Sequence, residues 1–117
     1  MKTSFEFSDK VIGIVLEEKM DENVLKKIQE MVEQRLEDYS EVSLYLEDRY
    51  SNGVTLKAFL KDLWYELSNT EPLFKVAVVT DKKRFQIITA LKDKLLSTNV
   101  QYFDRKERVA AMNWVME

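Results

Sequence analysis

The residues best placed to do chemistry are two clusters of cations, each directly after an apolar run that ends in aspartate. They are Lys82, Lys83 and Arg84 after Asp81, and Arg105, Lys106 and Arg108 after Asp104. Both clusters fall in the expected first turn of a helix, where main-chain N–H groups already favour anions. This pattern indicates a site for a phosphate, a lipid headgroup or an acidic partner. The alternative is a solvated surface that Asp81, Asp104 and Glu107 neutralise locally.

The chain lacks two of the residue types that enzymes most often use in catalysis, because it contains no cysteine and no histidine. Thiol and imidazole nucleophiles, disulfides and the commonest zinc ligands are therefore excluded. We predict no catalytic residue, no cofactor and no metal. A hard-cation site at Glu17, Glu18, Glu47 and Asp48 is the weaker alternative, since Glu47 is equally suited to pair with Lys82 or Arg49.

Composition describes an ordinary soluble globular domain. Of 117 residues, 45% are hydrophobic and 33% charged, with only two glycines and one proline, which predicts a single domain over residues 1–117. The net charge of −3 argues against nucleic-acid binding. The longest apolar run, Val11 to Leu16, is too short for a transmembrane segment, and residues 1–10 lack the apolar core of a signal peptide. A cytoplasmic location is expected.

The hydrophobic periodicity predicts nine elements in the order ββαβαβαβα. Strands are expected at residues 4–7, 11–19, 42–47, 73–80 and 100–103, and helices at 21–38, 55–68, 82–95 and 105–114. The result is a mixed five-stranded sheet with strand one antiparallel and the others parallel, wound as a βα superhelix.

Right-handed crossovers that add strands in one direction put the crossover helices on one face of the sheet. The other face is then expected to be poorly covered, and Tyr45 and Lys75 fit such a half-buried face. We therefore expect a homodimer, formed through this face or through the edge strand Ser4–Phe7.

Several short segments carry a family resemblance. They are Leu44-Tyr45-Leu46-Glu47, Asp62-Leu63, Val76-Ala77-Val78-Val79 with Asp81, Tyr102-Phe103-Asp104, and Ala110 with Trp114. In this order the chain resembles the SpoIIAA-like group, which is related in fold to STAS domains and to CRAL-TRIO lipid-binding domains. The resemblance implies no enzymatic activity.

The same resemblance implies two further sites. Antagonists of the STAS type carry a phosphorylatable serine in an Asp-x-Ser-Gly setting after strand three. Here Asp48 is in place but Tyr50 stands where the serine would be, which leaves Ser51 and Thr55 as candidates. A CRAL-TRIO likeness implies that Phe59 and Trp64 line an apolar pocket under a movable helix, whereas ordinary packing on the sheet is the alternative.

These observations predict a non-enzymatic binding domain. Its ligand is expected to be a lipid or a small amphipathic anion, held at the carboxyl edge of the sheet by the six cations with Phe59 and Trp64. The alternative is a STAS-like regulatory module that docks another protein. A bound lipid would favour the first hypothesis, and a stoichiometric protein partner would favour the second.

Overall fold

The computed structural model of the chain describes residues 3–8, 10–17, 22–49, 58–63, 65, 73–81 and 99–117. Its labelled elements are β1 (Thr3–Ser8), β2 (Val11–Leu16), α1 (Glu22–Arg35), β3 (Val42–Asp48), β4 (Leu73–Thr80), β5 (Asn99–Asp104), the 3₁₀ turn η3 (Arg105–Glu107) and α4 (Arg108–Met116). Residues 58–63 and Tyr65 are also helical. The predicted helix at 82–95, and the ends of the one at 55–68, lie outside the described residues.

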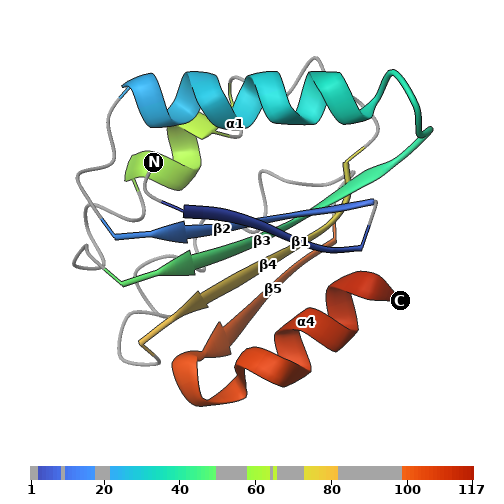
Figure 1. Cartoon of the computed structure of the whole chain (residues 1–117). Helices are drawn as coiled ribbons and strands as arrows, with labels where there is room; N and C mark the ends of the chain where they lie inside the picture. The colour runs from blue at the N-terminus through green and yellow to red at the C-terminus, as the bar shows by residue number, and fades with distance from the viewer. Residues whose placement is uncertain are drawn as a thin grey trace.

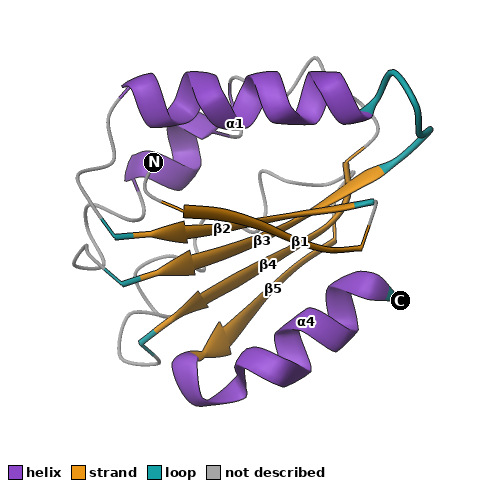
Figure 2. Ribbon diagram, viewed as in Figure 1, coloured by secondary structure: helices purple, strands orange, loops and turns teal. Residues whose placement is uncertain are grey.

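The sheet has the strand order β1-β2-β3-β4-β5 (Figure 2). Strands β2 to β5 are mutually parallel, which confirms the predicted α/β domain built on a parallel sheet. Strand β1 pairs antiparallel with β2 at the edge, with a register shift between Phe5 and Ser8. The parallel pairing brings the carboxyl ends of β2, β3, β4 and β5 to one edge, because Leu16 pairs with Asp48, Glu47 with Val79, and Thr80 with Asp104.

Helix α1 and the helix at residues 58–63 lie on one face of the sheet (Figure 1). Val24, Ile28 and Val32 are the buried residues of α1, spaced by one turn each, so this stripe faces the strands. The core on this face joins them to alternate residues of the strands and to Phe59, Leu60 and Leu63. Full burial of aliphatic side chains of this size contributes roughly 1.5–3 kcal/mol each.

Helix α4 covers the opposite face (Figure 1). A second core there contains Val11, Tyr45, Ala77, Val79, Phe103, Ala111 and Val115. The expectation of a poorly covered far face was therefore wrong, and Tyr45 is fully buried. The physical reason is that α4 buries its apolar residues Ala111 and Val115 against this face of the sheet.

Two residues, Lys75 and Phe103, contact Trp114 near the end of α4. Lys75 donates a hydrogen bond from Nζ to the Trp114 carbonyl oxygen at 2.9 Å, and the same Nζ lies 5.0 Å from the centre of the indole ring. The indole also packs on Phe103, with ring centroids 5.9 Å apart. A cation at a helix C-terminus is favourable because it faces the negative end of the dipole. Lys75 therefore joins β4 to the last turn of α4.

Candidate functional site

Polar side chains gather where β3 and β4 end. Glu47, Asp48 and Thr80 have exposed fractions of 2%, 1% and 0%, although each carries polar atoms. Burying a carboxylate is costly unless it is paired and hydrogen-bonded. Each therefore requires partners, which come from β3 and β4 themselves and from the residues that follow β3 and β5.

The carboxylate of Glu47 has three partners. It accepts hydrogen bonds from the Tyr45 hydroxyl at 2.7 Å and from Arg49 Nε at 2.6 Å. Arg108 Nε lies 3.1 Å from the first carboxylate oxygen, but within the described residues this buried nitrogen makes no aligned hydrogen bond. The Arg108 contact is thus an ion pair. The side chains of Arg49 and Arg108 remain a little over 40% exposed, so water also reaches them.

The neighbouring Asp48 is held by two other elements. Thr80 Oγ1 donates to the Asp48 carboxylate at 3.2 Å across the β3–β4 pair. Arg105 donates from Nε and Nη2 to the main-chain oxygen of Asp48, at 3.1 and 2.9 Å. This forked contact joins the start of η3 to the end of β3. Together with Arg108 on Glu47, it attaches the N-terminal end of the last helix to the centre of the sheet.

The environment of Glu47 raises the pKa of two of its neighbours. Burial, followed by the hydrogen bond to Glu47, raises the pKa of the Tyr45 phenol well above its ordinary value of 10.0. The hydrogen bond to Glu47 also raises the pKa of Arg49. The phenol therefore stays neutral and the guanidinium stays charged at physiological pH. This arrangement stabilises a fixed network of Tyr45, Glu47 and Arg49.

The predicted basic cluster on the last helix is thus largely turned inward. Of its three members, Arg105 and Arg108 contact β3, and Lys106 is exposed. The predicted pairing of Glu47 with Arg49 is confirmed. Asp104 and Glu107 form the predicted capping box, in which the Lys106 N–H donates to Asp104 and the Asp104 N–H donates to Glu107.

The remaining predicted site residues are either buried in the core or outside the described residues. Phe59 is buried in the core on the α1 face, with 4% of its surface exposed. Six further candidates lie outside the residues whose side chains the structure describes, namely Lys82, Lys83, Arg84, Trp64, Ser51 and Thr55. Within the described ranges, no group of three or more acidic side chains is arranged to hold a metal ion.

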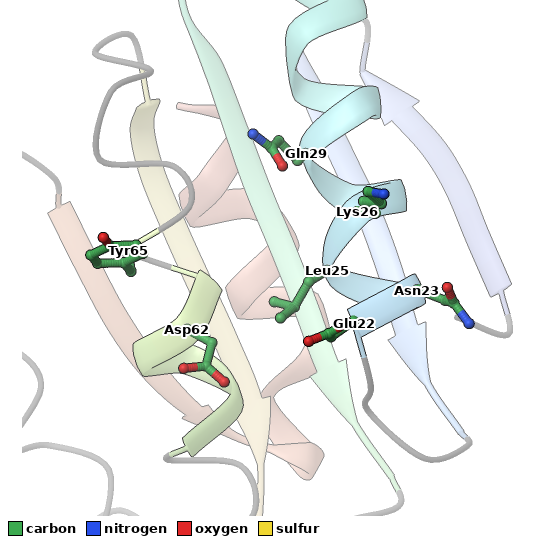
Figure 3. Close-up of a pocket in the computed structure, with 7 residues that line it drawn as sticks. All are labelled: Glu22, Asn23, Leu25, Lys26, Gln29, Asp62 and Tyr65. Carbon is green, nitrogen blue, oxygen red and sulfur yellow. The ribbon is translucent and has the colours of Figure 1, made fainter.

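Sequence reasoning missed a groove of about 500 Å³ between α1 and the helix at residues 58–63 (Figure 3). It is lined by Glu22, Asn23, Leu25, Lys26, Gln29, Asp62 and Tyr65. The side chains of Glu22 and Leu25 point from α1 toward the helix that carries Asp62 (Figure 3). Tyr65 is 79% exposed, which is unusual for a large aromatic side chain. In the sequence, this surface is indicated by an aromatic residue, Tyr65, two positions after the buried Leu63 of the same helix.

Helices of the described segments are too short or too polar to cross a bilayer. Comparison with curated proteins and with solved structures finds no match. A family model does match, described as SpoIIAA-like, over residues 11–116. This span begins at β2 and ends with α4, and so includes the parallel sheet and both covered faces. The chain therefore belongs to the SpoIIAA-like family, as the short segments had indicated.

Proposed function

We propose that this chain is a non-enzymatic regulatory module that works by docking another protein. The observation that carries the proposal is the SpoIIAA-like match over residues 11–116, since this family is related in fold to the STAS domains of regulatory proteins. Fold alone does not fix function. The surface chemistry of the described residues therefore has to favour a protein over a lipid.

Two features favour a protein partner. Two of the six cations predicted to hold an anionic headgroup, Arg105 and Arg108, instead contact acceptors on β3. The groove beside α1 is lined mainly by polar and charged side chains, whereas a lipid site is concave and mostly apolar. The lipid hypothesis gains no support from either feature or from the family match.

The groove is the surface we assign to the partner. It offers one exposed aromatic side chain, Tyr65, beside the carboxylates of Glu22 and Asp62. An aromatic anchor with a polar rim is typical of protein interfaces, in which a few residues carry most of the binding energy. The partner segment is expected to present a basic side chain to these carboxylates.

The test is affinity capture with two matched variants. Asp62→Lys with Tyr65→Ala alters the groove without touching a buried residue, and Glu33→Lys makes the same charge change at an exposed position farther along α1. We expect a stoichiometric partner to bind the wild type and Glu33→Lys, and to be lost from the groove variant. Equal retention by all three would refute the groove assignment.

Native mass spectrometry of protein purified without detergent tests the alternative. The module hypothesis predicts the mass of the protein alone or with its protein partner. A bound lipid mass in the wild type would instead favour the lipid-binding hypothesis. Ser51 and Thr55 remain proposed phosphorylation sites, and an intact mass increase of one phosphate on protein from its native source would support them.

A further inference from the structure

Helix α4 is apolar on almost every side, although only one side packs on the sheet. Its sequence from Arg108 to Met116 contains one charged residue, and only Ala111 and Val115 are fully buried. Val109 is 70% exposed and Met116 is 44% exposed. A helix that is hydrophobic all round is normally buried all round. The outer side of α4 therefore has the composition of a covered surface.

Six of the seven exposed residues between Lys106 and Glu117 form one stripe, and the seventh, Glu107, lies outside it. In chain order the stripe residues are Lys106, Val109, Ala110, Asn113, Met116 and Glu117. Their spacing of three and four residues places them on one side of the helix, opposite Ala111 and Val115. The stripe has a cation at its N-terminal end, apolar residues with one asparagine in its middle, and an anion at its C-terminal end. The carboxylate of Glu107 is held by the Asp104 N–H in the capping box, which keeps it off the stripe.

A stripe with opposite charges at its two ends is complementary to itself when reversed. We propose that α4 pairs antiparallel with α4 of a second copy of this chain, about a two-fold axis near Asn113. Lys106 then lies within one turn of Glu117 of the second copy, and the small side chain of Ala110 leaves room for Met116 of the second copy. An isologous contact of this kind closes as a dimer. Antiparallel pairing also opposes the two helix dipoles favourably.

The size of the surface sets the strength of the contact. Nine residues of helix span about 13 Å, and one face of such a helix covers much less than the roughly 1,000 Å² that stable interfaces bury. The dimer is therefore expected to be weak, with a dissociation constant on the order of 10⁻⁴ M. The groove beside α1 lies on the other face of the sheet, so dimerisation leaves it accessible (Figure 1).

Sedimentation equilibrium of the full chain, from about 10 μM to 1 mM, tests the proposal. We expect the mass to rise from 13.9 kDa toward twice that value. Val109→Asp should leave a monomer throughout. Lys106→Glu and Glu117→Lys should each weaken the dimer by about tenfold, because each reverses two symmetry-related charge contacts. An equimolar mixture of these two charge variants should recover dimerisation, since their heterodimer pairs opposite charges at both ends.

The charge variants also separate this contact from a folding defect. Glu at the start of a helix and Lys at its end favour the helix dipole, so neither reversal should destabilise the monomer. A wild type that stays monomeric at 1 mM would overturn the proposal. A dimer that ignores Val109→Asp would also overturn it, because the contact would then lie elsewhere, for example at the β1 edge. Failure of the mixed variants to recover dimerisation would overturn the antiparallel arrangement.

Discussion

Replacing Glu47 with glutamine isolates the buried charge network, since the side chain keeps its shape and loses its charge. The carboxylate accepts hydrogen bonds of 2.7 and 2.6 Å from Tyr45 and Arg49 and forms an ion pair with Arg108. A hydrogen bond to a charged group contributes about 1.5–3 kcal/mol. The amide can still accept from one donor, so one such bond is lost. Two effects offset part of this lost stability. Water can solvate the partly exposed side chains of Arg49 and Arg108, and burying a neutral amide costs less desolvation energy than burying a carboxylate.

We therefore expect Glu47→Gln to lower the free energy of unfolding by about 1–3 kcal/mol. This corresponds to a Tm reduction of roughly 4–12 °C for a chain of this size. Urea unfolding followed by circular dichroism measures the change, and an unaltered slope with urea would show that the variant unfolds from the same native state.

The matched control is Glu17→Gln, because Glu17 contacts the same arginine from an exposed position. Its carboxylate lies 3.9 Å from Arg49 Nη1, and its side chain is 42% exposed. An exposed pair of this kind contributes less than about 1 kcal/mol and weakens as salt rises. If the two variants lose equal stability, or if Glu47→Gln is as stable as the wild type, the buried network does not hold the sheet edge as argued.

Two further predictions concern the α4 side of the sheet. Because the pKa of Tyr45 is raised in the folded state, the stabilisation by its neutral phenol is complete below the ordinary pKa of 10.0 and is lost as the pH rises above that value. Above pH 10.0, the unfolding free energy of the wild type should therefore fall about 1.4 kcal/mol per pH unit more steeply than that of Tyr45→Phe. Parallel pH profiles of the two proteins would contradict this. Lys75→Met should weaken the attachment of α4 to the sheet by about 1–2 kcal/mol, because it removes both contacts of Lys75 with Trp114. The amides of α4 should then exchange faster with solvent deuterium, and unchanged exchange rates would show that these contacts do not hold the helix.

The sequence predicted the elements well where one periodicity dominates. The apolar strand at β4 and the one-turn spacing of α1 both appear as expected, as does the capping box at Asp104. Local signals of this kind depend on residues within one turn or one strand. Boundaries were less accurate: strand β2 ends at Leu16, whereas the prediction extended it to Lys19.

The covered far face could have been predicted from β2. Its six residues, Val11 to Leu16, contain no polar side chain and are all buried. A strand without polar alternation is typical of a sheet covered on both faces, whereas the poorly covered face was inferred from Tyr45 and Lys75. Tyr45 is buried because its hydroxyl reaches Glu47, and the amine of Lys75 reaches Trp114. Each polar tip thus finds a partner that the sequence alone does not place nearby.

In the candidate site, too, the partners of the polar side chains are distant in the sequence and could not be predicted from it. From the sequence, Arg105 and Arg108 had acidic neighbours only within their own segment, and a free anion site was a sound hypothesis. Their partners, Asp48 and Glu47, precede them by 57 and 61 residues, and only the parallel register brings these positions together.

The position of α4 follows from contacts at its two ends rather than from extensive burial. Arg105 and Arg108 attach its start to β3, and Lys75 attaches its last turn to β4. Only Ala111 and Val115 are fully buried between these attachments. Polar contacts are directional, whereas apolar burial alone would let so evenly hydrophobic a helix roll about its axis. The same contacts that neutralise the carboxyl edge therefore also determine which side of α4 stays outside, and that side carries Val109 and Met116.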